Sequence, residues 1–362
     1  MAVTFYCLKS SEPGTSWRIP MSAKSLPVSA PSRRAVVTAA SAVLAGMLAL
    51  TGCGTGSPSS SGTAATPQGD KAGGNLEKVS VGLIPITDVA PVYLGVQEGY
   101  FKEEGLELDV QLAQGGAAIV PAVMTGDYQF GYSNVVSLLV AQDKGLPITV
   151  VSNGSTSTNE PGSDTTEVAA MPDSGIGNAA DLVGKTVAVN ALNNFADITI
   201  RNSIEQAGGD PTGVKFVEMP YPNMPAALER GDVDAAWTTE PFRTQILQAG
   251  GKIVASPMTD MAEKFDSAFY FTSKQTLEKN PELVERFRRA LEKSFDFAMK
   301  NEDKVRTIIQ DYAKVTPELA ESIVMSKWYK DVNMDALTKL GTAAKKYDVL
   351  KKDPDYDALI AK

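Results

Sequence analysis

The chain has 362 residues, a formal net charge of −9, 43% hydrophobic residues and no histidine. This length predicts two or more domains with an ample core. The acidic balance argues against nucleic acid as the main partner, because phosphate backbones are bound by clustered Lys and Arg, but it leaves a small anionic ligand open. Without histidine, the chain cannot build Ser-His-Asp or Cys-His catalysis or a His-ligated zinc site.

The N-terminal region has the pattern of an export signal. Arg33 and Arg34 precede sixteen residues without a charge, 35–50. A membrane-spanning helix needs about 20 apolar residues, so this run is typical of a signal-peptide core. It ends in Leu-Thr-Gly-Cys53, which resembles a bacterial lipoprotein box, in which the cysteine is lipidated. We therefore expect a signal peptide over residues 1–52 and lipid attachment at Cys53.

The segment after the cysteine is rich in Gly, Ser and Pro and cannot bury a core, which predicts a flexible tether over residues 53–77. The protein would then be exported and lipid-anchored on the outer face of the cytoplasmic membrane. The arginine pair allows either general or twin-arginine export, and translation could start at Met1 or Met21.

Strands and helices are expected to alternate from residue 79 onward. The first half predicts strands at 79–84, 106–112, 129–132 and 148–152, and helices at 91–98, 116–126 and 134–144. After a break at 153–164, we expect strands at 167–171, 186–190, 214–218, 235–238, 252–255 and 268–272, and helices at 194–207, 224–230 and 241–248. This alternation predicts parallel sheets in an α/β fold.

An all-helical tail follows the last expected strand. Asn280-Pro281 and Thr316-Pro317 each predict a helix start, with the polar residue as N-cap and the proline in the first turn.

The sequence contains an internal echo. Residues 121–133 align with residues 225–238 with one residue inserted, and both copies contain a Gly-Asp pair followed by a short apolar stretch. Each copy then has an aromatic and a hydroxyl residue, Tyr132-Ser133 in the first and Trp237-Thr238 in the second. Both pairs would lie at carboxyl ends of strands, where open α/β sheets bind ligands. Two similar lobes facing each other predict a cleft that closes on a small molecule.

Several segments carry a resemblance to a known family: residues 81–106, 114–118, 181–189, 192–197 and 234–242. In order and spacing they resemble solute-binding proteins of bacterial ABC importers, in the NMT1/THI5-like branch that binds nitrate, bicarbonate, sulfonates, taurine and pyrimidine precursors of thiamine. The resemblance covers about residues 78–345.

The resemblance implies an α/β, two-lobed periplasmic-binding-protein-like fold of type II. Two crossing segments, near 153–166 and 256–268, would join the lobes. The first lobe would comprise residues 78–160 plus 268–362, with the C-terminal helices packed on it, and the second lobe residues 161–267.

Candidate ligand contacts in the first lobe follow its strands. Thr87 and Asp88 follow the first strand, where they can cap a helix or touch the ligand. Gly115 and Gly116 let backbone amides approach a ligand, although a plain turn explains them nearly as well. Two further candidates, Ser133 and Asn134, imitate a nucleophile elbow, but without a second glycine or any histidine a hydrogen-bonding role is favoured.

Candidates in the second lobe are amides, aromatics and one acid. They are Asn193, Asn194, Phe195, Tyr221, Trp237 and Glu240. One asparagine would cap a helix and leave the other free, and Trp237 would offer a stacking surface or belong to the core. Glu240 would complement a helix dipole or pair with an N–H-rich ligand. If Asp88 and Glu240 both face the cleft, a zwitterion or neutral heterocycle would fit better than a simple anion.

Together these features predict a binding protein with no catalytic residues, no cofactor and no metal. It would be a monomer that captures a small polar organic or anionic molecule and delivers it to an ABC permease and its ATPase. One alternative is a pyrimidine synthase of the same fold, although the related synthases use a pyridoxal cofactor on a lysine together with a histidine. The other is a receptor that signals to a membrane sensor.

Overall fold

The computed structural model describes residues 76–361, which all belong to one compact unit. The expected signal peptide, tether and lipidation site at Cys53 lie outside these residues, apart from the last two tether positions, of which Glu77 already begins a strand. In the described residues, no helix combines the length and apolar character needed to cross a membrane.

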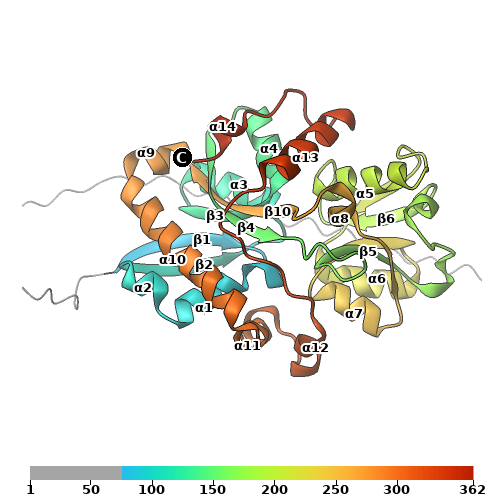
Figure 1. Ribbon diagram of the computed structural model, residues 1–362, viewed down its shortest axis with the longest axis horizontal. Coiled ribbons are helices and arrows are strands. Elements are labelled where there is room, and N and C mark those ends of the chain that lie inside the picture. Colours follow the sequence, from blue (N-terminus) through green and yellow to red (C-terminus); the bar gives the residue numbers. More distant parts are fainter. Residues whose placement is uncertain (1–75, 362) are drawn as a thin grey trace, which may run out of the picture. The chain divides into compact units, whose positions relative to one another are not determined.

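Two five-stranded sheets form the centres of two lobes (Figure 1). The first has the order β2-β1-β3-β10-β4, with strands Leu106–Leu112, Glu77–Leu83, Phe130–Asn134, Asp266–Ser273 and Ile148–Thr156. The second has the order β7-β6-β8-β5-β9, with strands Lys215–Glu218, Thr186–Val189, Ala235–Thr239, Thr166–Ala170 and Lys252–Ala255. The chain therefore passes between the lobes after β4 and again before β10, as a two-lobed fold with two crossings requires.

The expectation of parallel sheets is only partly right: β1 pairs in parallel with β2 and β3, and β6 with β7 and β8, but each sheet also contains antiparallel pairs. Strand β10 runs antiparallel to β3 and β4, and β5 runs antiparallel to β8 and β9. Each sheet therefore receives one strand from a crossing, and such a strand arrives in the opposite direction to those made by strand–helix–strand connections. The expected break at residue 153 is also too early, because β4 continues to Thr156. The predicted lobe boundaries remain a prediction.

Helices cover both sheets. The first lobe has α1 (Ala90–Gln97), α2 (Tyr100–Glu103), α3 (Gly116–Thr125) and α4 (Val135–Asp143), and the second has α5 (Phe195–Gln206), α6 (Met224–Arg230), α7 (Phe242–Gln248) and α8 (Pro257–Met261). The tail contains α9 (Lys274–Lys279), α10 (Pro281–Lys300), α11 (Glu302–Ala313), α12 (Pro317–Ser322), α13 (Met334–Lys346) and α14 (Tyr356–Leu359). Short 3-10 turns occur at Thr87–Val89, Pro172–Ser174, Ala179–Leu182 and Tyr221–Asn223.

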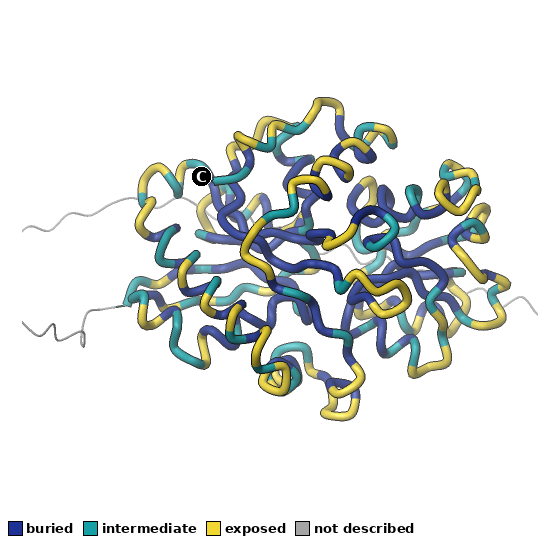
Figure 2. Tube along the Cα trace, in the orientation of Figure 1, coloured by how far each residue is buried: buried dark blue, intermediate teal, exposed yellow. Residues whose placement is uncertain are grey.

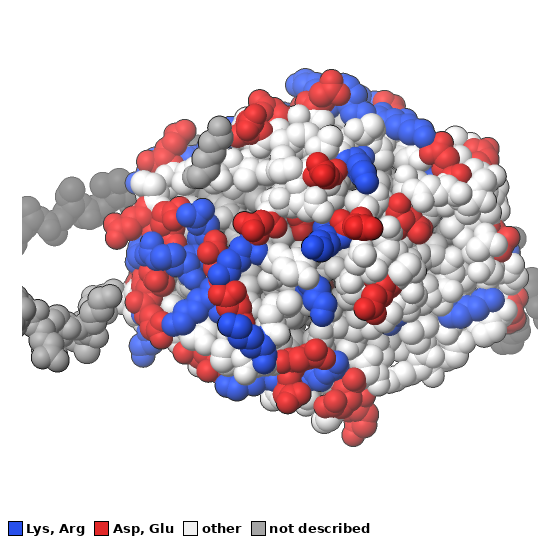
Figure 3. Space-filling model, in the orientation of Figure 1, with Lys and Arg blue, Asp and Glu red and all other residues white. Residues whose placement is uncertain are grey.

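Helix α10 attaches the tail to the first lobe. The side chain of Asn280 caps it, and its apolar stripe, which includes Phe287 and Phe295, is buried (Figure 2). The ring of Phe287 stacks on Phe130 of β3 at 3.9 Å between centroids. The outer face of α10 carries charges of both signs (Figure 3). One of them, Arg289, forms an ion pair of 2.7 Å with Glu104, which follows α2. An amphipathic helix of this kind is stabilised mainly by packing of its apolar face.

The internal echo corresponds to a repeated strand arrangement. The strands of the two sheets correspond in order: β2 to β7, β1 to β6, β3 to β8, β10 to β5 and β4 to β9. The side chain of Gln129 accepts a hydrogen bond from the amide of Ser80 at 2.8 Å, and Asp234 accepts one from the amide of Thr186 at 2.7 Å. The same bond at the same place in each sheet confirms that the two halves repeat one plan.

Candidate functional site

A cavity of about 30 Å³ lies where the two lobes meet, and we call it the inner cavity. Four pairs of equivalent positions line it, one residue of each pair from each lobe: Ile84 and Asn190, Tyr132 and Trp237, Asn134 and Thr239, Ala268 and Thr166. The remaining lining residues are Ile86, Asp88, Phe195, Tyr221 and Ser267. Because the paired positions lie at strand ends, the repeat brings the same edge of both sheets to one place.

The one charged residue lining this cavity within residues 76–361 is Asp88, which is buried in the turn Thr87–Val89. Its Oδ2 accepts hydrogen bonds from the hydroxyls of Tyr132 at 3.1 Å and Ser155 at 2.8 Å. Its Oδ1 accepts one from the hydroxyl of Ser326 at 2.7 Å, and the indole of Trp328 donates to its backbone oxygen at 2.8 Å. Among residues 76–361, hydroxyl groups therefore hold this carboxylate and no lysine or arginine forms an ion pair with it.

Tyr132 is fixed as a hydrogen-bond donor. Burial, followed by the nearby negative charge of Asp88, raises the pKa of Tyr132 well above its usual value. The phenol therefore keeps its proton at physiological pH, and its oxygen lies 3.1 Å from Oδ2 of Asp88 and 2.8 Å from the hydroxyl of Ser155.

Aromatic rings form much of the wall on the second lobe. Trp237 meets Phe195 edge to face, with centroids 5.4 Å apart, and lies 6.2 Å from Tyr221. The indole nitrogen of Trp237 is buried and has no hydrogen-bond partner within residues 76–361. A buried indole N–H normally finds a partner, so this group is a donor available to a ligand.

Two amides add hydrogen-bonding capacity to the cavity. Asn134 uses its Oδ1 to cap α4 by accepting from the amide of Ser137 at 2.9 Å. Asn190 lines the opposite side, just after β6. These amides can both donate and accept hydrogen bonds without adding charge.

Asn194 joins the lobes and does not line the cavity. Its Oδ1 caps α5 by accepting from the amide of Phe195 at 2.8 Å, while its Nδ2 donates to the hydroxyl of Ser137 at 3.1 Å. A second bond between the lobes runs from the amide of Thr87 to the backbone oxygen of Glu240 at 3.3 Å. Closure of the cleft in this state is therefore supported by direct bonds between the lobes.

The glycine pair and Ser133 are packed together beside the cavity. A Cβ at Gly116 would lie 2.1 Å from the hydroxyl oxygen of Ser133, and one at Gly115 would lie 3.3 Å from Nδ2 of Asn190. Gly116 therefore allows α3 to approach β3 closely. Asn193 is exposed, and its amide donates to Asp197 at 2.8 Å. None of these four candidates lines the cavity.

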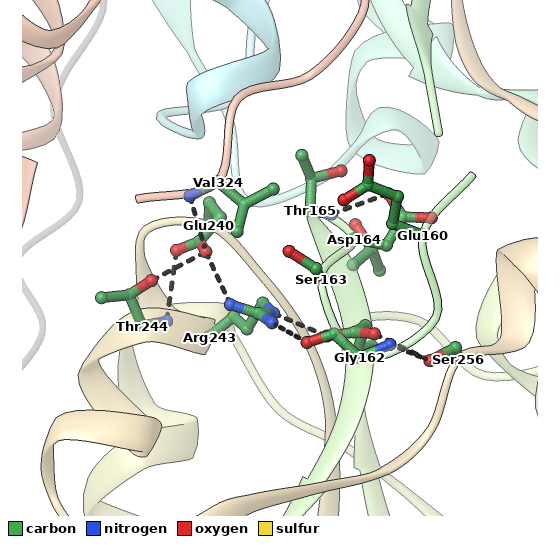
Figure 4. A network of polar contacts seen from close by, with 12 residues as sticks. Glu160, Gly162, Ser163, Asp164, Thr165, Glu240, Arg243, Thr244, Ser256 and Val324 are labelled. Carbon is green, nitrogen blue, oxygen red and sulfur yellow. Dashed lines mark hydrogen bonds and ion pairs between the residues drawn. The ribbon is translucent and has the colours of Figure 1, made fainter. Parts of the chain in front are cut away.

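Glu240 belongs to a separate buried network (Figure 4). Its Oε1 accepts hydrogen bonds from the hydroxyl of Thr244 at 2.7 Å, from Arg243 at 3.3 Å and from the amide of Val324 at 3.3 Å. Arg243 also pairs with Glu167 at 2.7 Å. Burial raises the pKa of Glu240, and its contacts with Thr244 and Arg243 oppose that rise. This acid therefore does not face the cavity, and only Asp88 does.

The geometry agrees with the comparisons to known proteins. Residues 86–305, more than half of the chain, match the profile of the family described as NMT1/THI5 like. The chain belongs to the NMT1/THI5-like family. Among curated relatives, the taurine-binding periplasmic protein of Escherichia coli is 26% identical over 215 residues, 59% of this chain and 65% of that protein. The formylaminopyrimidine-binding protein of Halalkalibacterium halodurans is 23% identical over 221 residues, 60% of this chain and 64% of that protein.

Enzymes also occur among the relatives of this NMT1/THI5-like chain. The 4-amino-5-hydroxymethyl-2-methylpyrimidine phosphate synthase of Aspergillus parasiticus is 26% identical over 225 residues, 58% of this chain and 63% of that protein. The match thus spans less than two thirds of each of these three relatives.

Solved structures establish the fold of the NMT1/THI5-like chain. The aliphatic sulphonate binding protein SsuA of E. coli superposes with a TM-score of 0.63 at 16% identity, covering 78% of this chain and 96% of that one. The nitrate-binding protein NrtA of Synechocystis gives 0.67 at 13% identity, covering 79% and 86%. The expected two-lobed, periplasmic-binding-protein-like architecture is confirmed.

Sequence reasoning missed several cavity residues of this NMT1/THI5-like protein. Asn190, Thr166 and Ser267 were not among the candidates, and neither was Thr239, although the echo aligns it with Asn134. Extending the echo by one residue would have identified Thr239. Ser326, which holds Asp88, had no local signal, because it lies 238 residues away from its partner.

Proposed function

We propose that this protein is the extracytoplasmic solute-binding component of an ABC importer, which encloses a small polar organic molecule between its lobes. The observation that carries this proposal is the convergence of four equivalent pairs of strand-end residues on one cavity. A pocket built from both lobes couples ligand binding to closure, since a ligand that contacts both lobes favours the closed state over the open one.

The lining chemistry favours a ligand that is planar and not purely anionic. Among the described residues, none that lines the inner cavity is a lysine or arginine, and Asp88 supplies the only formal charge there. A nitrate-like or sulfonate-like anion would meet this charge without a compensating cation. Aromatic rings, the unpartnered indole N–H of Trp237 and the amides of Asn134 and Asn190 suit a neutral heterocycle or zwitterion.

The volume of the inner cavity indicates how the site is used. One water needs about 10–15 Å³ of such space, so 30 Å³ admits only a very small group. An incoming ligand must separate the lobes, which breaks the bonds from Thr87 to Glu240 and from Asn194 to Ser137. Ligand contacts to both lobes would replace or add to these bonds when the cleft closes again.

The site residues proposed from the sequence divide into three roles. Asp88, Asn134, Phe195, Tyr221 and Trp237 would contact the ligand. Thr87, Asn194 and Glu240 would support closure, and Gly115, Gly116, Ser133 and Asn193 would shape the surrounding backbone. Lipid attachment at Cys53, a monomeric state, and delivery to a membrane permease and ATPase complete the proposal.

A thermal-shift screen of the full chain tests this function. Taurine, alkanesulfonates, nitrate, aromatic acids, 4-amino-2-methylpyrimidines and flavins would be compared, because a ligand at 100 times its Kd stabilises the folded state by about 2.7 kcal/mol. A heterocycle or zwitterion should give the largest shift, and Trp237→Ala should abolish it. If no compound in any class raises the melting temperature, the proposal fails.

The synthase-like relatives justify one direct test of catalysis. A pyridoxal cofactor needs a lysine for its Schiff base, and the lining of the inner cavity, taken over residues 76–361, includes none. The described site therefore does not fit that cofactor. Adding pyridoxal phosphate to the protein and recording the absorption spectrum checks this conclusion, because a Schiff base in the cleft would favour the enzyme.

A further inference from the structure

A second cavity adjoins the first on the side of the cleft formed by the segments after β1 and β2. This outer cavity has a volume of about 260 Å³. From the first lobe it is lined by Pro85 and Leu112, and from the second by Pro222 and Phe242. Both lobes therefore contribute to it, as they do to the inner cavity.

The two cavities share a wall. Ile84, Ile86 and Tyr221 line both of them. The ring of Tyr221 lies 6.2 Å from Trp237, which lines the inner cavity, and is stacked on Phe242, which lines the outer one, at 6.3 Å and 8° between planes. Tyr221 therefore lies between the two cavities, beside one aromatic ring of each.

The outer cavity is apolar. Apart from Gln114 and the hydroxyl of Tyr221, its lining side chains are hydrocarbon or aromatic. Leu112 is 55% exposed at its rim, which makes it the most exposed large hydrophobic residue among those described. Ordered water needs two to four polar partners, so the apolar walls of this cavity favour a hydrocarbon group over water. Apolar surface of this kind gains free energy when a ligand covers it.

We propose that the outer cavity is a second subsite of the cleft, which receives an apolar substituent of the same ligand whose polar group is held in the inner cavity. This inference rests on the proposed solute-binding function and makes the ligand class more specific. The ligand is amphiphilic: a planar or zwitterionic polar group carries an alkyl or aryl substituent that passes Tyr221 and covers Leu112 and Phe242. Once the lobes have separated to admit the ligand, the polar lining of the inner cavity and the apolar lining of the outer cavity contact different parts of it.

Two series of probes with growing side chains test the subsite in the full chain. One series is 4-amino-2-methylpyrimidine with hydrogen, methyl, ethyl or butyl at position 5, and the other is the linear alkanesulfonates from methane to octane. Isothermal titration gives the Kd of each member. Burial of one methylene corresponds to about a fourfold gain in affinity, so the Kd should fall about fourfold per added carbon in the series that the inner cavity accepts.

Variants at the rim locate the effect. In Leu112→Ser and Phe242→Ala, the gain in affinity per added carbon should fall to twofold or less, whatever the Kd of the shortest probe. Leu192→Ser is the matched control, because Leu192 is 43% exposed and lines neither cavity, so its series should keep the wild-type slope. Leu112 is exposed, so its variant should fold even if Phe242→Ala does not.

The outcomes separate the two proposals. If the shortest probes bind and the Kd does not change with chain length, the outer subsite is overturned and the solute-binding function stands. The subsite is also overturned if the slope persists in Leu112→Ser and Phe242→Ala. If no member of either series binds, both the ligand class and the subsite are overturned.

Discussion

Both lobes bury carboxylates near the cleft, but different groups stabilise these carboxylates in each lobe. In the first lobe, Asp88 accepts hydrogen bonds from three hydroxyl groups and forms no ion pair with any residue in the described part of the chain. In the second lobe, Glu167 and Glu240 share Arg243, which is itself only 3% exposed. This difference in partners determines which acid a ligand can reach. The glutamates are committed to the arginine, whereas the charge of Asp88 remains available at the cavity.

Another buried acid follows neither pattern. Asp197, in the first turn of α5, accepts a hydrogen bond from the amide of Asn193, but its other oxygen is buried without a hydrogen-bond partner among residues 76–361. Burial raises the pKa of Asp197 to about 6.

Removal of the shared cation should have the largest effect. Arg243→Met leaves two buried carboxylates without compensation, so we expect a loss of about 4 kcal/mol in the free energy of unfolding at pH 7.5, measured by urea denaturation. The loss should shrink at pH 5, because the carboxyl groups can then take up protons. Arg230→Met is the control, since its ion pair with Asp232 is exposed and its removal should barely move the midpoint. Equal midpoints for both variants would contradict the comparison.

The next effect depends on pH. Because the folded-state pKa of Asp197 is raised above its unfolded value of 3.8, its protonated form favours folding, and this contribution is lost as the pH rises from 3.8 through about 6. Asp197→Asn does not titrate. Its stability relative to the wild type should therefore rise by about 2.4 kcal/mol between pH 4 and pH 7. A difference that stays constant over this range would show that burial does not shift Asp197.

Neutralising the acid at the cavity should have an intermediate effect on stability. In Asp88→Asn, the side chain can accept from fewer of its three hydroxyl partners, so we expect a loss of about 2 kcal/mol. The same change removes the charge that opposes anions. Methanesulfonate should therefore bind more tightly to the variant than to the wild type, as measured by isothermal titration, and weaker binding would indicate that Asp88 does not repel anions.

The smallest effect concerns one hydroxyl partner of Asp88. Ser326→Ala removes a single hydrogen bond to a carboxylate that keeps two others, so we expect a loss of about 1 kcal/mol in urea denaturation. Ser322→Ala is the control, because Ser322 is exposed on α12. A loss above that of Asp88→Asn would mean that Ser326 has a role other than holding the acid.

Local signals explain how much of the fold was predictable. The helix starts at Asn280-Pro281 and Thr316-Pro317 each follow from a capping side chain and a proline in the first turn. The structure confirms both caps. The echo placed Tyr132 and Trp237 at equivalent strand ends, and both line the inner cavity. Each of these features depends on residues close in sequence or on a repeated pattern.

Features that depend on distant pairing were not predictable. The direction of β10 and β5 follows from the crossings between lobes, and no local pattern encodes it. The sequence around Glu240 does not show whether its side chain faces a ligand or Arg243. The packing of α7, which carries Arg243, determines this orientation. Likewise, Trp328 meets Asp88 across 240 positions of the chain.

The tail segment from Val324 to Trp328 has a consequence for how the protein is made. The second sheet is built from one continuous stretch, β5 to β9, whereas the first needs β10 and the cleft acid needs Ser326 and Trp328. Chains emerge from the ribosome N-terminus first, and domains fold as units. The second lobe can therefore mature early, and the binding site is finished only after about nine tenths of the polypeptide has appeared.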